Sequence, residues 1–371
     1  MLRLCWNKTG TTILKYICFV TIIIKYLETP VDITQNTDPT APSRKKDHIE
    51  LAFKSSVDKS ELDSRFYYEP FLNGHPQNDK QGSFSFLGKN FDHPIWVSSM
   101  TGGTALAGTI NKNLAKACKE YGLGMGLGSC RALLESEEYL QDYSVRKHIG
   151  DQALYTNLGI AQVEQLASDN ALYKIDELIA KLEADGLIIH VNPLQEWLQP
   201  EGDNILHHPI ETIKRVLDEL PTKIIVKEVG QGFGINSMKA LLQLPLQAIE
   251  FSAGGGTNFS SLELMRAEEA MQVTYNKISS LGHSAMEMVT FYNQAIEDLG
   301  DKVLCHEVIV SGGVKDFLDG YYYINKVKGN AIYGQASAML AYAKKDYESL
   351  HKFVAAQVSG LALAKNYLKV R

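Results

Sequence analysis

Eight short apolar segments, each followed by a stretch with helical periodicity, occupy the sequence from about residue 94 onward. A repeated strand and helix alternation is typical of a parallel sheet with helices on its outside, and eight repeats close such a sheet into a barrel. The pattern therefore predicts an α/β fold, a TIM (β/α)8 barrel. The predicted strands are Pro94–Ser99, Gly122–Leu127, Ala153–Asn157, Leu187–Val191, Lys223–Lys227, Ala248–Ser252, Val308–Ser311 and Ala331–Tyr333.

The stretches between these strands carry apolar residues at helical spacing. Two stretches, 193–206 and 257–280, are longer than usual strand-to-helix loops, and we expect them to be lids over the carboxyl ends of the strands. The predicted helices are Gly108–Tyr121, Val163–Ala184, His208–Leu220, Ser237–Leu244, Ala285–Leu299, Val314–Lys326 and a last helix from about Ala336.

Composition sets broad limits on function. A chain of 371 residues with 45% hydrophobic content and a net charge of −6 is globular and lacks the basic excess of a nucleic-acid-binding protein. Its five cysteines are widely spaced and form no Cys-x-x-Cys pair, which predicts neither a disulfide framework nor a zinc site and favours a reducing, cytoplasmic compartment. Cys130 is expected to be a small buried residue rather than a reactive thiol.

The first 42 residues differ from the rest and are predicted to be a leader or linker, with residues 43–371 as a single domain. The apolar run from Ile13 to Ile24 is interrupted by Lys15 and is shorter than the roughly 20 residues that span a bilayer. No stable membrane span is expected. An over-extended start, an anchor at a membrane surface and a secretion signal remain open for this segment.

The segment from Gly186 to Asp203 changes from an apolar strand to a dense set of polar residues. His190 and Asn192 lie two apart and point to the same side of an extended chain, and Gln195 and Glu196 follow in the loop. Because chemistry in a barrel sits at the carboxyl ends of its strands, this cluster is a candidate active site. A polar loop with a capping Asn and a solvated Glu is the alternative.

Glycine-rich turns follow three late strands and predict a phosphate site. Ser311-Gly312-Gly313 and Gly334-Gln335-Ala336 each open a helix, and Ala253-Gly254-Gly255-Gly256-Thr257 can add donors. Backbone N–H groups at helix N-termini bind phosphate, and this fold places such a cradle after strands seven and eight. Glycines that serve only the turn geometry are the alternative.

Three further segments carry possible ligand contacts. Ser98 to Thr104 contains two glycines that let a flat ligand approach the backbone. Lys227 ends a buried strand, where it either stabilises negative charge on a reduced cofactor or pairs with Glu228. The run Arg44-Lys45-Lys46-Asp47-His48 either binds a diphosphate or is a solvated basic turn.

Together these motifs resemble the type 2 isopentenyl-diphosphate delta-isomerases, which are FMN-dependent TIM barrels. The resemblance covers about residues 43–345, and its most specific part is His190-Val-Asn192-Pro-Leu-Gln195-Glu196 with Pro200-Glu201-Gly202-Asp203 behind it. It implies Gln195, His190 and Lys227 as catalytic residues and Glu196 as the Mg²⁺ ligand. It also implies substrate contacts from Arg44, Lys45, His48, Ser129, Arg131, His190, Asn192 and Gln195, and FMN contacts from Met100, Thr101, Gly102, Gly103, Ser129, Asn157, Lys227, Ser252, Thr257, Gly312, Gly313, Gly334, Gln335 and Ala336.

The resemblance implies reversible isomerisation of isopentenyl diphosphate to dimethylallyl diphosphate, a step of isoprenoid biosynthesis. Reduced FMN would transfer the proton, NADPH would reduce the flavin without net redox change, and the protein would be a homo-oligomer, a tetramer or octamer. The chain departs from the family at Cys130, where a longer Gln or Met is more common, and residues 1–42 have no counterpart.

Two other functions are compatible with a flavin-binding barrel. An FMN-dependent 2-hydroxy-acid oxidase shares the late glycine loops, but those enzymes resemble one another in a His-Gly-Gly-Arg element after strand six. Here that loop reads Ser252-Ala-Gly-Gly-Gly-Thr257, with no catalytic base. A flavin-binding barrel without activity is the third possibility, against which the intact Gln195-Glu196 pair argues.

Overall fold

The computed structural model describes residues 40–76, 82–99 and 104–371, which belong to two units, residues 1–63 and 64–371. In the first unit, helix α2 (Ala41–Leu51) begins after Thr40 with proline in its first turn, and a short 3-10 helix η2 (Lys59–Glu61) follows. Residues 1–39, which make up most of the leader predicted over 1–42, lie outside the described residues, and α2 begins within the last residues of that leader. None of the helices in the described ranges is long and apolar enough to cross a membrane.

In the second unit, eight parallel strands of the described chain close into a barrel, which confirms the predicted TIM fold. Every predicted strand is present, with ends shifted by no more than a few residues. The barrel strands are β4 (Ile95–Val97), β5 (Gly124–Gly126), β6 (Leu154–Gly159), β7 (Gly186–His190), β8 (Ile224–Lys227), β9 (Ala248–Glu250), β10 (Glu307–Ser311) and β11 (Asn330–Gln335).

The side chains inside the barrel form an apolar layer below a polar one. Successive residues of a strand point to opposite faces, so residues two apart share the inner face. The apolar layer is a buried cluster that includes Trp96, Tyr155, Ile188, Ile225, Ala248, Ile309 and Ile332. Two positions further along the same strands, towards their carboxyl ends, stand Ser98, Asn157, His190, Lys227, Glu250, Ser311 and Gly334.

A hairpin closes the amino-terminal end of the barrel. Strands β2 (Phe84–Phe86) and β3 (Lys89–Phe91) are antiparallel, and Phe86, Leu87 and Phe91 are fully buried in the inner apolar cluster. Leu87 has a positive φ of 54°, a strained conformation for leucine, and its N–H donates to the Glu307 carboxylate at 2.8 Å. This end of the barrel is therefore filled with apolar side chains.

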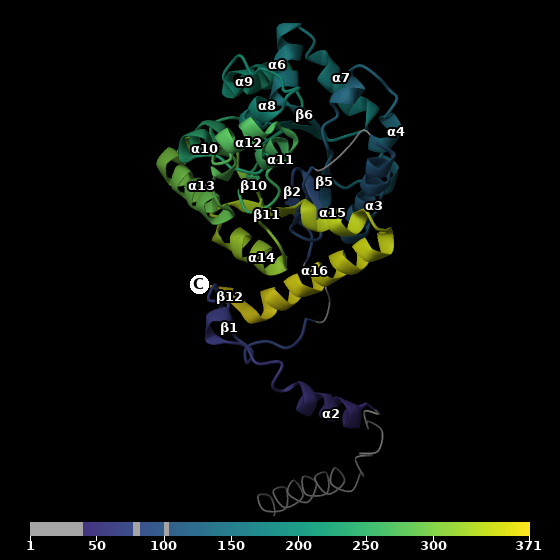
Figure 1. Cartoon of the computed structure of the whole chain (residues 1–371), viewed down its shortest axis with the longest axis vertical. Coiled ribbons are helices and arrows are strands. Elements are labelled where there is room, and N and C mark those ends of the chain that lie inside the picture. Colours follow the sequence, from purple (N-terminus) through teal and green to yellow (C-terminus); the bar gives the residue numbers. More distant parts are fainter. Residues whose placement is uncertain (1–39, 77–81, 100–103) are drawn as a thin grey trace, which may run out of the picture. The chain divides into compact units, whose positions relative to one another are not determined.

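Helices surround the strands of the second unit (Figure 1), and the long C-terminal helix packs against the helices after the first and last barrel strands. Strand β1 (Phe66–Tyr68) pairs with β12 (Leu368–Val370) outside the barrel. The helices are α3 (Ala105–Tyr121), α4 (Leu140–Tyr143), α5 (Arg146–Ile149), α6 (Ile160–Ser168), α7 (Tyr173–Lys181), α8 (Pro193–Leu198), α9 (Pro209–Glu219), α10 (Ile235–Leu242), α11 (Phe259–Arg266), α12 (Glu269–Tyr275), α13 (Ala285–Leu299), α14 (Phe317–Lys326), α15 (Ser337–Ala343) and α16 (Tyr347–Tyr367).

Two helix predictions need correction. The helix expected over 163–184 is two helices, α6 and α7, because Asn170 adopts a left-handed φ of 53° that ends the first. The last predicted helix is also two, since the Asp346 side chain caps a new N-terminus by accepting from the Ser349 N–H at 2.7 Å. The expected lids contain helices as well: α8 lies in the stretch 193–206, and α11 and α12 lie in 257–280.

Candidate active site

A cavity of about 340 Å³ opens at the carboxyl ends of β4 and of β8 to β11. Its volume falls within the range of small-molecule sites. The three glycine-rich turns that the sequence singled out contribute to its wall. Of the residues predicted to contact a cofactor, those lining it are Lys227, Ser252, Thr257, Gly312, Gly313, Gly334, Gln335 and Ala336.

The turns after β9 and β10 touch each other through their backbones. Gly312 has a φ of +90°, and a Cβ added there would lie 2.0 Å from the Ala253 carbonyl oxygen. A Cβ at Gly256 would lie 3.1 Å from the Gly313 nitrogen. Glycine at position 312 is therefore required by the contact between the two turns, whether or not the cavity holds a ligand. That contact brings the backbones of both turns to one wall of the cavity.

Two polar side-chain atoms of the lining lack a hydrogen-bond partner among the described residues. These are Ser99 Oγ, next to the end of β4, and Gln335 Oε1, at the end of β11. Buried polar atoms nearly always form hydrogen bonds in folded proteins. Two such atoms without a partner in the same cavity therefore indicate a polar ligand. Glycine turns beside a helix N-terminus together with these atoms fit a ligand that carries both a phosphate and a polar ring.

Lys227 supplies the cavity with a buried cation. Only 7% of the residue is exposed, and its Nζ donates to the Glu228 backbone carbonyl at 2.7 Å. The Glu228 carboxylate instead accepts from the N–H groups of Gly230 and Gln231, at 2.7 and 2.6 Å. Among the described residues no ion pair joins the two side chains, so the alternative in which Lys227 only pairs with Glu228 loses its main support.

A buried carboxylate beside Lys227 is a polar group that sequence reasoning missed. Glu250 is fully buried and stands opposite Lys227 in the register of β8 and β9. One of its oxygens accepts from Ser98 Oγ at 2.5 Å, and the other has no partner among the described residues. The sequence did contain a signal for Glu250, which is the one charged residue in the apolar run that begins at Ala248. A buried charge is costly unless it has a partner, so a glutamate in a buried strand suggests a functional group.

His190 and Asn157 form a hydrogen-bonded pair in the polar layer. Asn157 Nδ2 donates to the Leu127 carbonyl at 3.0 Å, so its Oδ1 faces His190 Nδ1, at 2.7 Å. An oxygen acceptor at Nδ1 places the proton there and leaves Nε2 as an acceptor. Burial, and secondly the charge of Lys227, lower the pKa of His190 to about 3, so the imidazole is neutral at pH 7.

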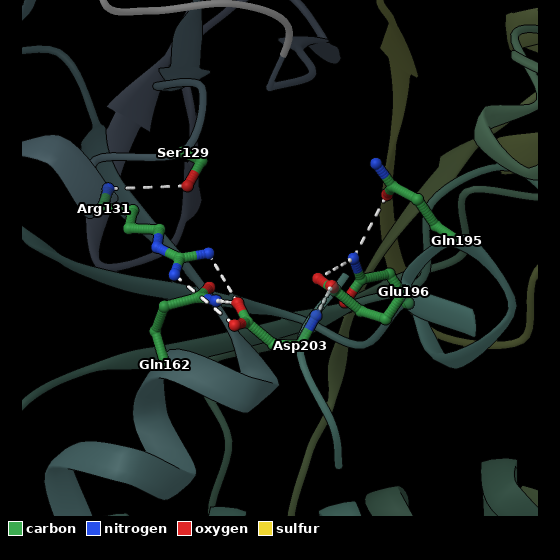
Figure 2. Close-up of polar contacts among 7 residues, drawn as sticks. Ser129, Arg131, Gln162, Gln195, Glu196 and Asp203 are labelled. Carbon is green, nitrogen blue, oxygen red and sulfur yellow. Dashed lines mark hydrogen bonds and ion pairs between the residues drawn. The ribbon is translucent and has the colours of Figure 1, made fainter. Parts of the chain in front are cut away.

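Three polar side chains after β7 are in contact (Figure 2), and they lie at the N-cap and on the first turns of α8 rather than in the expected loop. Asn192 Nδ2 donates to Gln195 Oε1 at 3.1 Å and to Glu196 Oε1 at 2.9 Å. The other Glu196 oxygen accepts from the Asp203 backbone N–H at 2.8 Å. Asn192 is 2% exposed, and its Oδ1 has no partner among the described residues. Asn192, Gln195 and Glu196, which the sequence grouped in one candidate site, are therefore in mutual contact, and their roles stay predictions.

Arg131 and Gln162 converge on Asp203 at the other side of this network (Figure 2). Arg131 Nη1 lies 2.5 Å from Asp203 Oδ2, and Gln162 Nε2 donates to the same oxygen at 2.7 Å. Arg131 remains more than half exposed, so its guanidinium is open to a further anion. Asp203 joins the arginine to Glu196 through its own backbone, a role that the sequence did not predict.

Glu263 of α11 is a second buried carboxylate that the sequence did not reveal. It is 3% exposed; its Oε1 accepts from Gln195 Nε2 at 3.4 Å and its Oε2 pairs with Arg266 Nη1 at 2.5 Å. Arg266 also pairs with Glu201, in the loop that follows α8. Nothing in the local sequence distinguishes Glu263 from a solvated helix residue, since an i,i+3 pair with Arg266 also occurs on exposed helix faces and Gln195 is 68 residues away.

The remaining predicted contacts lie elsewhere or outside the described residues. Met100, Thr101, Gly102 and Gly103 are outside the description, and Arg44, Lys45 and His48 lie on α2 in the first unit. Ser129 and Asn157 do not line the cavity; the Ser129 carbonyl accepts from Tyr143 Oη at 2.7 Å. Burial raises the pKa of Cys130 to about 12, so this residue is an unreactive buried thiol as expected.

No cluster of three or more His, Cys, Asp or Glu side chains suited to a metal occurs in the described ranges. Magnesium, however, is commonly held by one or two carboxylates together with substrate phosphates and water. Each oxygen of Glu196 accepts one hydrogen bond and retains a lone pair, so this side chain fits the part of a single protein ligand.

The fold and site define a TIM-barrel protein with a glycine-lined cavity beside a polar side-chain network. No protein-family model matches the chain. It is 34% identical to the isopentenyl-diphosphate delta-isomerase of Nostoc sp. over 77% of this chain and 80% of that protein. It is also 34% identical to the isopentenyl-diphosphate delta-isomerase of Rickettsia prowazekii, over 81% of this chain and 85% of that protein. The chain belongs to the isopentenyl-diphosphate delta-isomerase family.

Solved structures of more distant proteins share the fold. A mandelate oxidase with an FMN adduct has a TM-score of 0.51 at 14% identity and covers 83% of this chain and 88% of its own. A flavocytochrome b2 with sulfite has a TM-score of 0.55 at 15% identity, and the match covers 81% of this chain and 72% of that protein. At this identity the likeness concerns the fold alone.

Proposed function

We propose that the chain is a type 2 isopentenyl-diphosphate delta-isomerase that uses reduced FMN and Mg²⁺. The observation that carries the proposal is the position of Lys227, which lies in the same inner layer as His190 and lines the glycine-walled cavity. The cavity and the His-x-Asn-x-x-Gln-Glu network are thereby parts of one site, in a chain whose relatives are named as isomerases of this substrate.

FMN is proposed as the ligand of the cavity. The turns of Gly312, Gly313 and Gly334 would hold its phosphate, and Gln335 and Lys227 would contact the ring. FMN would supply proton transfer to and from the alkene carbons, which no side chain here is acidic enough to perform. A cation near the ring favours its anionic reduced form, and this is the part we assign to Lys227.

The polar network is proposed to hold the substrate. Glu196 would hold Mg²⁺ through its carboxylate, and the ion would supply positive charge against the diphosphate. The exposed guanidinium of Arg131 would contact the same diphosphate, together with Ser129. The substrate contacts that the sequence implied for Arg44, Lys45 and His48 stay predictions. Asn192 would add its amide group to these contacts.

Two side chains would act near the reacting carbons. The Gln195 amide is fixed at both ends, by Asn192 and by Glu263, so it can orient a hydrocarbon chain beside it. Neutral His190 offers Nε2 as an acceptor and adds no charge that would repel a cation-like transition state. The oxidase alternative is disfavoured because the turn after β9 holds neither His nor Arg.

Turnover of isopentenyl diphosphate tests the proposal. Purified protein should be yellow and inactive until NADPH or dithionite reduces the flavin, and should then convert many substrate molecules without oxygen or further reductant, in a magnesium-dependent manner. Consumption of one NADPH per product would indicate a redox enzyme instead. A cytoplasmic location, a homo-oligomer, and a single domain over residues 43–371 stay predictions.

A further inference from the structure

We propose that Arg266 is a positioning residue for Gln195 and that it joins the two lid segments, 193–206 and 257–280. The inference rests on the proposed function, because it takes Gln195 to lie beside the reacting carbons. Arg266 itself lines no part of the cavity and contacts none of the residues assigned to substrate or cofactor.

One arginine contacts carboxylates from both lids. Its Nη2 pairs with Glu201, behind α8 in the first lid, and its Nη1 lies 2.5 Å from Glu263 Oε2 in the second. Helices α8 and α11 also pack against each other. The planar guanidinium can engage two carboxylates at once, which the single point charge of lysine does less well.

The Glu263 carboxylate transmits this contact to Gln195. Its side chain is 4% exposed, whereas the Arg266 and Glu201 side chains are about half exposed. A buried carboxylate that loses its cation takes up a proton or turns to solvent. Either change alters Glu263 Oε1, which accepts the hydrogen bond from Gln195 Nε2 at 3.4 Å. The Arg266 charge therefore stabilises the orientation of the Gln195 amide.

The test compares Arg266→Met with Arg215→Met in the full-length, flavin-loaded protein. Arg215 forms a similar ion pair, with Glu219, on α9 and contacts neither lid. We expect Arg266→Met to lower kcat by about tenfold to a hundredfold with little change in KM for isopentenyl diphosphate, since positioning of the reacting group rather than binding is lost. Arg215→Met should leave both constants unchanged.

Two further variants and a second measurement separate positioning from misfolding. Arg266→Lys should recover part of kcat, and Glu201→Gln should lower it less than Arg266→Met, because Glu263 keeps its partner. Hydrogen exchange should rise in both residues 193–198 and 259–266 in Arg266→Met and in neither segment in Arg215→Met.

The outcomes distinguish this proposal from the function on which it rests. An unchanged kcat in Arg266→Met, or a rise in KM alone, overturns the positioning role. If the reduced wild-type protein shows no turnover, the proposed function fails, and the exchange measurement alone decides whether Arg266 joins the lids. If hydrogen exchange in Arg266→Met rises only in residues 259–266, Arg266 does not join the two lid segments.

Discussion

The two halves of the site are built in different ways. The cavity after β9, β10 and β11 is walled by backbone, and its shape depends on glycines such as Gly312 that allow two turns to touch. The network after β5, β6 and β7 is built mainly from side chains. Arg131 pairs with the Asp203 carboxylate, the Asp203 backbone N–H donates to Glu196, and Asn192 joins Glu196 to Gln195. The shape of the backbone half depends on its turns, whereas the other half depends on charged side chains such as Arg131, Asp203 and Glu196.

This difference predicts how each half fails. A change of shape should destroy the backbone half together with the fold around it. A change of charge in the network should leave the fold intact and remove the chemistry. The polar layer inside the barrel connects the halves, because Lys227 faces the cavity and lies beside His190 in the strand register.

The largest effect is expected from Gly312→Ala. The new Cβ would lie 2.0 Å from the Ala253 oxygen, and the φ of +90° is unfavourable for alanine. We expect a loss of about 3 kcal/mol or more in the free energy of unfolding and loss of bound flavin. Urea unfolding and the absorbance of the purified protein measure both. Gly300→Ala is the control, since φ is +52° there and no atom lies within 4 Å of the added Cβ. Equal effects at the two sites would contradict the role of the turn contact.

Glu196→Gln should have the next largest effect, on activity rather than on the fold. Loss of the metal-binding charge should lower turnover by about a hundredfold or more and weaken its magnesium dependence, while flavin stays bound. The amide can replace only one of the two hydrogen bonds of the carboxylate, so stability should fall by only about 1 kcal/mol. A magnesium titration of turnover checks this, with Glu177→Gln on the exposed face of α7 as control. Wild-type activity across the titration would remove the metal assignment.

Lys227→Met should separate flavin retention from flavin reactivity. The side chain keeps its length but loses the cation, so the anionic reduced flavin loses charge stabilisation worth about one pKa unit, or about tenfold in turnover. The oxidised flavin should stay bound. Redox titration should show a more negative midpoint potential, and Lys227→Arg, which retains the charge, should lie close to the wild type. An unchanged potential in the methionine variant would argue that Lys227 has only a structural part.

The smallest effect is a pH dependence of stability through His190. Burial, and secondly Lys227, lower its pKa to about 3, against about 6.5 in an unfolded chain. The unfolded state therefore binds one more proton between these values, and stability is lost as the pH falls below about 6.5, by on the order of 1 kcal/mol per pH unit. Urea unfolding between pH 7 and 5 should give a shallower dependence in His190→Gln. Parallel curves for the variant and the wild type would contradict the lowered pKa.

Much of the backbone half could be predicted from the sequence. Eight apolar runs indicated the barrel, and Ser311-Gly312-Gly313 and Gly334-Gln335-Ala336 indicated the cavity, because turn geometry is a local property that particular residues encode. The His190 to Glu196 segment was predictable for the same reason, since its members lie within one turn of a strand end.

The tertiary structure alone decided which distant groups meet. Glu250, Glu263 and Asp203 act through partners 152, 68 and 72 residues away in the chain, and no local pattern identifies those partners. The tautomer and lowered pKa of His190 likewise depend on Asn157 and Lys227, which come from neighbouring strands. Local backbone preferences are written in consecutive residues, whereas burial and charge environment depend on every element that packs around a group.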